Sequence, residues 1–307
     1  MGDPVDARRL PGESGELARV MDEQTVFGRV TPDQKEAMVG ALQSQGHVVA
    51  MTGDGVNDVL ALKKADIGIA MGSGSAATRA IAQLVLLDGK FATLPGVVAE
   101  GRRVIGNIER VANLFLTKTV YSTLLSIIIG LAGWAFIFLP RHLTLISALT
   151  IGIPAFFLAL APNKARYRPG FVKRVLRFAM PAGIVVALAA FAAGALSRVY
   201  SWVSVSESRT AAVFVIAIIG LWVLGVLARP FTFWKAFLVM AMVAGLLLAI
   251  ILAIFVPYVR DILALDLPSW SVLAQTLGIA AVAIVLIEIA WRFTGWRPRG
   301  DQSERAP

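Results

Sequence analysis

The sequence predicts an α/β part of soluble character followed by an all-α membrane bundle. Hydrophobic residues make up 57% of the chain and its mean hydropathy is +0.73, whereas soluble domains average roughly 45–50% apolar residues. The excess is uneven. Up to about residue 110 the chain alternates short apolar runs with polar helical segments, and beyond it long apolar stretches alternate with short basic ones. One part is therefore expected in water and the other in a membrane.

In the first part, strands and helices alternate along the chain. Thr31 and Pro32 mark a helix start, since threonine caps a first turn and proline fits its first position. Such alternation favours a doubly wound parallel sheet, although too few strands are present for a complete domain of this class. The predicted strands cover residues 25–28, 47–51, 67–70 and 84–87, and the predicted helices cover 32–45 and 59–64.

Six apolar stretches follow, each close to the roughly 20 residues that a helix needs to cross a bilayer core. They cover residues 114–138, 143–161, 178–196, 211–227, 237–256 and 272–291. Charged residues over 96–113 precede the first span without a helix breaker. They predict one long helix that links the two parts, and a helix end that only anchors at the lipid headgroups is the alternative.

The loop charges predict the orientation of the spans. One set of loops is strongly basic, and the other carries only Arg141, Arg198, Arg209 and Arg260. Basic loops are cytoplasmic, so the α/β part and the C-terminus are expected in the cytoplasm, at the plasma (inner) membrane. These cations lie beside spans, so no nucleic-acid partner is expected. The basic set comprises Lys164, Arg166, Arg168, Lys173, Arg174, Arg177, Arg229, Lys235, Arg292, Arg297 and Arg299.

Two classes of feature are absent from the sequence. Cysteine does not occur, which excludes disulfides and thiolate coordination of a soft metal within this chain. Residues 1–15 are polar and lack the apolar core of a signal peptide.

The most informative motif is an acidic turn over residues 52–58, Thr-Gly-Asp-Gly-Val-Asn-Asp, directly after a predicted strand. Its glycines let the backbone turn sharply and approach a ligand closely. Asp54 and Asp58 supply hard oxygens that suit Mg²⁺. Because ligands bind at the carboxyl ends of parallel strands, this turn predicts a site for a phosphate group and its metal.

Four segments together resemble the second half of P-type ATPases. They are residues 28–35 (Gly-Arg-Val-Thr-Pro-Asp-Gln-Lys), 52–58, 62–72 (Leu-Lys-Lys-Ala-Asp-Ile-Gly-Ile-Ala-Met-Gly) and 100–102 (Glu-Gly-Arg). The resemblance implies a partial haloacid-dehalogenase-like (HAD-like) phosphorylation domain at 1–95, a stalk helix at 96–113, six transmembrane helices at 114–291 and a cytoplasmic tail at 292–307. It also implies an ATP-driven translocase that uses ATP and Mg²⁺.

The resemblance further implies roles for individual residues. Asp54 and Asp58 would bind Mg²⁺, Lys35 would neutralise phosphate charge, and Arg29 would contact the nucleotide. In phosphoryl transfer the protein mainly positions groups and stabilises charge, which these residue types can do. The implied catalytic residues are Lys35, Asp54, Asn57 and Asp58, and the implied nucleotide- and phosphate-binding residues are Arg29, Lys35, Thr52, Gly53 and Asn57.

Some of these residues have simpler interpretations. Taken alone, Lys35 and Arg29 are typical of solvated surface charges, and Asp66 is more typical of a strand-start or capping residue than of a ligand. Residues 11–15 superficially resemble the family's actuator motif but are expected to form a loop.

The sequence also departs from the family. It contains no Asp-Lys-Thr-Gly-Thr string, whose aspartate the family phosphorylates, and nothing that resembles the actuator, the nucleotide-binding domain or the first four spans. The chain is therefore expected to be the C-terminal part of a pump. By itself it should not hydrolyse ATP, and its expected partner is the N-terminal half.

The cargo is expected to be a cation. Six spans argue against the heavy-metal branch, and residues 144–163 are similar to the actinobacterial metal cation-transporting ATPase E group, which suggests Ca²⁺. However, Ile151 stands where calcium and sodium pumps have an aspartate, so their acidic site does not carry over to this chain.

A neutral transport path is predicted instead. Pro154 has no N–H and leaves the carbonyl of Thr150 unpaired, while Gly152 eases local unwinding. The alternative is a kinked packing helix whose hydroxyls bond their own carbonyls. Lys118 and Glu288 are expected near the membrane interface. The candidate path comprises Thr123, Ser126, Ser147, Thr150 and Pro154.

Three other functions stay open. The acid-poor spans are compatible with a pump for a lipid or a polyamine. The chain is also compatible with a non-catalytic membrane subunit from a truncated or split gene. A membrane-tethered phosphatase of the HAD class is disfavoured, because the strand that carries the nucleophile is absent.

Overall fold

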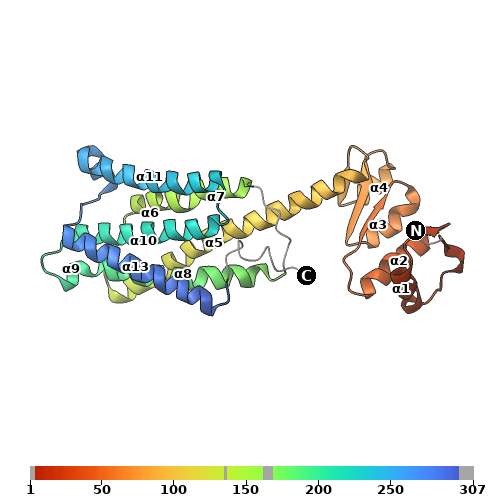
Figure 1. The fold of residues 1–307 in the computed structure, drawn as a ribbon, viewed down its shortest axis with the longest axis horizontal. Coiled ribbons are helices and arrows are strands. Elements are labelled where there is room, and N and C mark those ends of the chain that lie inside the picture. Colours follow the sequence, from red (N-terminus) through yellow and green to blue (C-terminus); the bar gives the residue numbers. More distant parts are fainter. Residues whose placement is uncertain (1–3, 135–136, 162–168, 297–307) are drawn as a thin grey trace. The chain divides into compact units, whose positions relative to one another are not determined.

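The computed structural model describes residues 4–134, 137–161 and 169–296, and the chain divides into two compact units, residues 1–98 and 99–307 (Figure 1). The predicted fold class is confirmed, because the first unit holds a small parallel sheet and the second holds helices of membrane-spanning length. Several predicted loop cations lie outside the described residues: Lys164, Arg166, Arg168, Arg297 and Arg299.

Unit 1 is built from short strands and helices in alternation. Its strands are β1 (Val5–Asp6), β2 (Phe27–Gly28), β3 (Ala50–Gly53), β4 (Ile67–Met71) and β5 (Leu84–Leu86). Its α-helices are α1 (Ser14–Glu23), α2 (Pro32–Ser44), α3 (Val59–Lys64) and α4 (Ala76–Ile81), and its short 3-10 helices are Ala7–Arg9, Val56–Asp58 and Phe91–Thr93.

The sheet that matters for the candidate site has the order β3-β4-β5, with all strands parallel. In its register Gly53 lies opposite Ala70, and Met71 lies opposite Leu86. The carboxyl ends of the three strands therefore meet at one edge, and the acidic turn begins there. This arrangement confirms the predicted parallel pairing of the second, third and fourth strands.

Two predictions for unit 1 need correction. The first predicted strand does not join this sheet, because β2 pairs with β1 in a separate two-stranded sheet, with Val5 opposite Phe27. The segment 11–15, expected as a loop, is only partly one: α1 begins at Ser14, after Glu13 in extended conformation.

The strand before the acidic turn starts later than predicted, at Ala50 rather than at residue 47. A side chain takes the place of a strand partner just before it, since the Asp66 carboxylate accepts a hydrogen bond from the Val49 N–H at 2.8 Å. Asp66 also accepts from the Gln43 side chain at 3.2 Å, and these hydrogen bonds hold its pKa below the usual value. Asp66 is thus a capping residue, as predicted.

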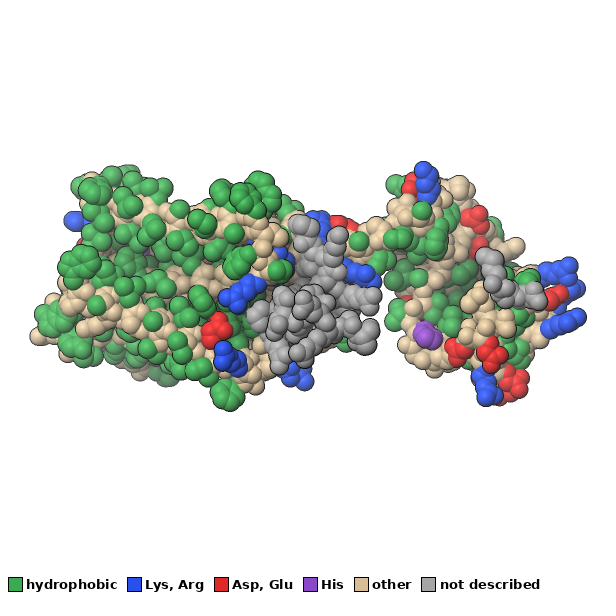
Figure 2. Space-filling model, viewed as in Figure 1, with side chains coloured by type: hydrophobic (Ala, Val, Ile, Leu, Met, Phe, Trp, Pro, Cys, Tyr) green, Lys and Arg blue, Asp and Glu red, His purple; other side chains and the backbone are tan. Residues whose placement is uncertain are grey.

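The described part of unit 2 is helical. Its elements are α5 (Leu94–Ala132, which begins in unit 1), α6 (Pro140–Ser147), a π-helical segment (Ala148–Gly152), α7 (Ile153–Leu160), α8 (Phe171–Gly194), α9 (Leu196–Val199), α10 (Val205–Ala228), α11 (Phe233–Phe255), α12 (Pro257–Leu263) and α13 (Trp270–Phe293). Six helical stretches of the described chain are long and apolar enough to cross a bilayer, and they match the six predicted spans. Figure 2 shows hydrophobic side chains over most of the visible surface of this unit.

The first span belongs to a helix that continues through the charged residues before it. Helix α5 has 39 residues without a break, which confirms the predicted continuity, and the boundary between the two units falls inside it. It ends at Ala132 rather than at residue 138, because Gly133 takes a left-handed conformation (φ 62°) that stops the helix.

Helix α10 lies at the centre of the bundle, where it packs against α8, α13 and α11 (Figure 1). Helix α11, by contrast, leaves most of its side chains exposed. Aromatic contacts fix α13 on α8: the rings of Phe178 and Trp291 stack with centroids 4.5 Å apart, and Trp291 Nε1 donates to the Phe178 carbonyl at 3.0 Å.

The second span is interrupted as predicted, but by a π-helix rather than by unwinding. The Ile153 N–H bonds the Ala148 carbonyl, five residues back. Pro154 follows immediately and has no N–H to continue the α-helical pattern. The wider turn keeps the chain helical through the region where a proline would otherwise break it.

Side chains of α5 cap the end of this interrupted span. Asn107 Nδ2 donates to the carbonyls of Ala159 and Ala161 at 2.9 and 2.6 Å, and Arg103 Nη1 donates to the Leu160 carbonyl at 3.0 Å. The last carbonyls of a helix lack partners within it, so α5 satisfies the groups that α7 leaves open.

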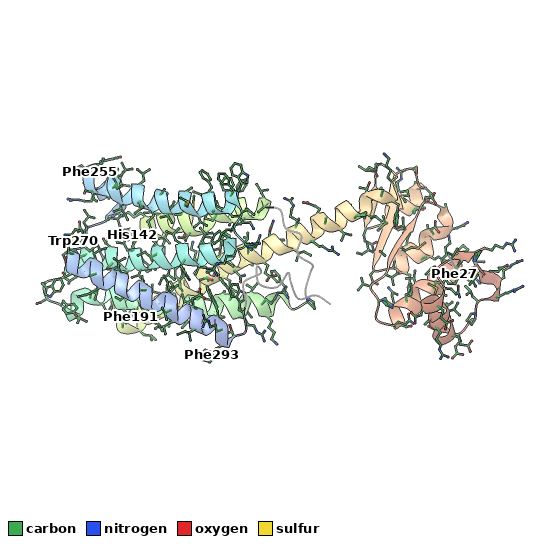
Figure 3. The ribbon with its side chains drawn as sticks, in the orientation of Figure 1. Phe27, His142, Phe191, Phe255, Trp270 and Phe293 are labelled. Carbon is green, nitrogen blue, oxygen red and sulfur yellow. The ribbon has the colours of Figure 1, made fainter. Side chains whose placement is uncertain are left out.

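At the other end of the span, α6 holds the short helix α12, which the sequence did not predict. His142, labelled in Figure 3, is buried, and its Nε2 lies 2.7 Å from the Leu263 carbonyl. Arg141 Nη1 donates to the Asp261 carbonyl at 3.0 Å. These two side chains satisfy the C-terminal carbonyls of α12 as a helix cap would.

Candidate functional site

The acidic turn leaves one carboxylate in solvent and buries the other. It leaves β3 at Gly53 and enters a 3-10 turn (Val56–Asp58) that leads directly into α3. Asp54 and Asn57 are exposed, and neither side chain is hydrogen bonded to a described residue. Asp58 is only 7% exposed. The two aspartates that the sequence treats as equivalent therefore differ in accessibility.

The buried aspartate forms an ion pair with the predicted phosphate-binding lysine. Lys35 Nζ lies 2.6 Å from Asp58 Oδ1, and the Gly55 N–H donates to Asp58 Oδ2 at 3.3 Å. Both carboxylate oxygens are thus used within the protein. Lys35 starts from α2, whose first turn carries a reciprocal capping box between Thr31 and Gln34. The structure therefore brings together Lys35 and Asp58, which are 23 residues apart in the sequence.

Gly53 permits this close approach. A Cβ atom built on Gly53 would lie 2.5 Å from the Asp58 Cβ and 2.7 Å from its Cγ, far inside a normal carbon–carbon contact of roughly 3.5–4.0 Å. Only a residue without a side chain fits where the strand passes the buried aspartate.

Helix α4, which the sequence did not predict, fixes the turn from the other side. The Thr78 hydroxyl donates to the Gly55 carbonyl at 3.0 Å, and the Ser75 N–H donates to the Asp54 carbonyl at 2.8 Å. Thr78 is fully buried. A signal for these residues existed in the sequence, because Ser75 caps α4 and accepts from the Thr78 N–H at 3.1 Å, a typical serine cap.

The exposed part of the turn fits a magnesium ion that is shared with a phosphate. No group of three or more histidine, cysteine or acidic side chains suited to a metal occurs in the described part of the chain. Mg²⁺, however, is usually held by one or two carboxylates together with waters and substrate phosphate. Asp54 offers such a carboxylate and Asn57 an amide oxygen, whereas Asp58 already has partners for both of its oxygens.

The structure gives Arg29 a different partner from the acidic turn. Its guanidinium lies 3.2 Å from the Asp6 carboxylate, and its backbone takes a left-handed conformation (φ 60°) just after β2. Asp6 is also hydrogen bonded to Arg8, and this contact, with the two positive charges, keeps the pKa of Asp6 well below its usual value. The nucleotide role of Arg29 therefore stays a prediction. Thr52 lies in β3 opposite Ile69, half-buried.

The candidate transport residues do not gather in one pocket. Thr150 is buried, and its hydroxyl donates to the Ile146 carbonyl at 2.8 Å. Thr123 and Ser126 lie on the exposed face of α5, where Ser126 donates to the Ser122 carbonyl at 2.8 Å. These contacts agree with the alternative of hydroxyls that satisfy their own helix.

The candidate Ser147 and two hydroxyls of α5 have no such partner. Among the described residues, Ser147 Oγ, Ser122 Oγ and Tyr121 Oη are buried without a hydrogen bond. Beside Thr150 lies a cavity of about 20 Å³, room for about one water molecule, which Tyr121 and Lys118 also line. Lys118, expected at the membrane interface, thus contributes to a cavity within the bundle. Glu288 accepts from Trp222 Nε1 at 3.1 Å.

Comparison with known proteins gives one consistent set of relatives. No protein-family model matches the chain. The chain is 52% identical over 307 aligned residues to the Calcium-transporting ATPase CtpE of Mycolicibacterium smegmatis. The alignment covers 96% of the chain and 38% of that relative. The protein of the same name from Mycobacterium tuberculosis is 50% identical, covering 97% of the chain and 39% of the relative. The probable cation-transporting ATPase exp7 of Streptococcus pneumoniae is 34% identical over 94% of the chain and 37% of the relative.

The chain corresponds in sequence to a C-terminal portion of P-type ATPases. This confirms the resemblance drawn from the four segments and the six spans. The chain spans only 37–39% of the length of these three relatives. With six helices of spanning length, it is a multi-pass membrane protein.

Proposed function

We propose that this chain forms the phosphate-binding turn and six spans of an ATP-driven pump that moves Ca²⁺ across the plasma membrane. The observation that carries the proposal is the exposed Asp54 carboxylate, held at the carboxyl edge of a parallel sheet beside the Lys35–Asp58 ion pair. The similarity to relatives named as calcium-transporting ATPases supports Ca²⁺ as the cargo.

In this proposal the residues of the turn have separate tasks. Asp54 and Asn57 would hold Mg²⁺, which supplies charge neutralisation at a phosphoryl group when bound. Asp58 positions the Lys35 ammonium, and Lys35 offers its positive charge to phosphate oxygens. The aspartate that accepts the phosphoryl group, and the nucleotide-binding and actuator domains, would come from the N-terminal part of the pump.

The orientation follows from the charges at the helix ends. Lys173 and Arg177 begin α8, Arg229 ends α10 and Arg292 ends α13, so these cations fall at one end of the spans. Since basic loops stay in the cytoplasm, we place this end there. The transport path would include the π-helical segment, with Ser147, Thr150 and Pro154, as a source of neutral oxygen atoms.

A chimera tests the proposal. The matching C-terminal portion of the M. smegmatis relative is replaced by this chain, and ATP-dependent uptake of radioactive Ca²⁺ is measured in inverted membrane vesicles. Uptake is expected, and Asp54→Asn should reduce it by about a hundredfold or more, since it removes the carboxylate that would hold the Mg²⁺ that neutralises the charge of the transferring phosphate. Glu16→Gln, an exposed change on α1, is the control and should leave uptake intact.

Each negative result has a defined meaning. A chimera that hydrolyses ATP but takes up spermine or a labelled phospholipid instead of Ca²⁺ would refute the cargo and favour the organic-substrate pump. A folded chimera with no phosphoenzyme would refute the catalytic role and favour a non-catalytic subunit.

A further inference from the structure

A groove opens on the surface of the bundle along the start of α8 and reaches Thr294, the residue that follows α13. Its volume is about 770 Å³. The two helices lie next to each other (Figure 1), and Figure 3 labels Phe293 at the last position of α13. The residues that matter for what it can bind are Val172, Lys173, Leu176, Arg177, Met180 and Thr294.

The groove combines a basic stripe with an apolar stripe. Lys173 and Arg177 are four residues apart on α8, so both project from the same side of the helix. Val172, Leu176 and Met180 follow the same spacing and form the stripe next to them, with Val172 65% exposed and the other two 42%. Val172 and Leu176 lie level with the two cations, each one residue earlier in α8, and Met180 lies about one turn further into the span.

Lys173 and Arg177 differ from the arginine that lies between them in sequence. Arg174, between them, is already taken by Glu109, whose carboxylate lies 3.1 Å away. Lys173 and Arg177, in contrast, are exposed, and their side chains make no hydrogen bond or ion pair with any described residue. An exposed arginine and lysine that face the same groove attract an anion, and arginine in particular binds phosphate with two parallel hydrogen bonds.

The walls of the groove are fixed. The Thr294 hydroxyl donates to the Arg177 carbonyl at 3.2 Å, which ties the end of α13 to α8. Deeper in, Trp291 and Phe178 stack between the same two helices, and Trp296 adds a third ring 4.7 Å from Phe178. A ligand would therefore enter a preformed groove rather than create one, which lowers the cost of binding.

We propose that this groove binds one anionic phospholipid, with its phosphate at Lys173 and Arg177 and an acyl chain along Leu176 and Met180. A phospholipid carries both required chemistries in one molecule, and acyl chains are the solvent of a membrane-spanning helix. Basic pockets between spans at the cytoplasmic side are typical sites for anionic headgroups. The proposal depends on the chain being a membrane protein and not on its cargo.

The test measures lipid binding to the whole chain, purified in a neutral detergent. Native mass spectrometry counts bound lipid in an equimolar mixture of phosphatidylglycerol and phosphatidylcholine. The wild type is expected to retain one phosphatidylglycerol in preference to phosphatidylcholine. The double variant Lys173→Gln, Arg177→Gln should bind phosphatidylglycerol about 25-fold more weakly, from about fivefold for each basic side chain near an anionic surface, with phosphatidylcholine unaffected.

Two further variants separate the explanations. Arg260→Gln removes an exposed cation from α12, at the opposite end of α11 from the basic loops, and should bind lipid like the wild type. Met180→Trp fills the groove behind the cations and should weaken phosphatidylglycerol binding while both charges remain. Size-exclusion profiles and circular dichroism confirm that each variant is folded.

Three results would overturn the proposal. Equal retention of the two lipids by the wild type would show that the groove does not select a charge. Equal loss in Arg260→Gln would assign the preference to net charge alone. Displacement of the lipid by inorganic phosphate, together with an unaffected Met180→Trp variant, would mean that the cations bind a soluble anion and that the apolar wall has no part.

Discussion

Replacing Gly53 with alanine perturbs the acidic turn at its tightest point. The new Cβ would lie 2.5 Å from the Asp58 Cβ and 2.7 Å from both its Cγ and its Oδ2. Carbon atoms normally approach no closer than roughly 3.5 Å, so strand and turn must separate by about 1 Å. The atoms that have to move are those of the aspartate whose carboxylate binds Lys35 at 2.6 Å and the Gly55 N–H at 3.3 Å.

The expected cost follows from these contacts. Overpacking a fixed site costs about 1–3 kcal/mol. Hydrogen bonds to a charged group contribute about 1.5–3 kcal/mol, and a shift of about 1 Å weakens the longer of the two. We therefore expect the free energy of local opening to fall by at least about 2 kcal/mol, which corresponds to roughly a 30-fold change in the opening equilibrium.

Hydrogen–deuterium exchange of the intact chain in detergent is the assay, because it reads residues 50–80 separately from the membrane helices. Gly55→Ala is the matched control: its added Cβ would come no closer than 3.8 Å to another atom, and its φ of −97° suits alanine. Exchange in the turn should rise about 30-fold in Gly53→Ala and less than about threefold in Gly55→Ala. Equal exchange in the two variants would refute the argument from close approach.

Three further substitutions test other contacts. Thr78→Val keeps the shape but removes one of the two hydrogen bonds that the Gly55 carbonyl accepts, since the Asp58 N–H still donates to it at 3.0 Å. Exchange over residues 52–58 should rise about fivefold, from about 1 kcal/mol for one hydrogen bond; unchanged exchange would contradict the clamp by α4. The pKa of Asp66 is lowered by its hydrogen bonds, so its stabilising effect is present above its unfolded pKa of about 3.9 and is lost as the pH falls further. Asp66→Asn should therefore flatten the fall in thermal stability below about pH 5, and an unaltered pH profile would contradict this. Gly220→Ala places a Cβ 2.9 Å from Thr150 Cγ2, and this overpacking of about 1–3 kcal/mol should lower the Tm of the detergent-solubilised chain. Gly225→Ala is the control, because its Cβ meets no atom within 4 Å and should leave the Tm unchanged. Equal Tm values for the two variants would contradict the tight contact.

The fold could be predicted where local patterns decide it. The predicted helix over 59–64 matches α3, because a run of good helix formers follows the glycine-rich turn directly. All six spans were found because length and apolarity alone determine them. The start of β3 was wrong by three residues, since Asp66, distant in sequence, takes the place of a strand partner. No local pattern contains such a contact.

The sequence could predict which residues lie in the acidic turn, but not the separate contacts that each of them makes. The sequence predicts that Asp54 and Asp58 lie in one turn and that both bind a metal. In the structure, Asp58 forms an ion pair with Lys35. Thr78 was also missed, because α4 has only six residues and no apolar periodicity. Burial and long-range pairing separate these roles, and both depend on how distant segments pack.

The π-helical segment has a geometric consequence for the span that contains it. A π turn holds about one residue more than an α turn, and each residue of an α-helix accounts for about 100° of rotation. The side chains of α6 and α7 are therefore out of phase by roughly one residue across Ala148–Gly152. If the segment tightened into an α-helix, α7 would rotate by about 100° relative to α6, and different side chains would face α10. A change between π-helix and α-helix would therefore turn α7 by about a quarter of a turn, without a hinge or a loop in the span.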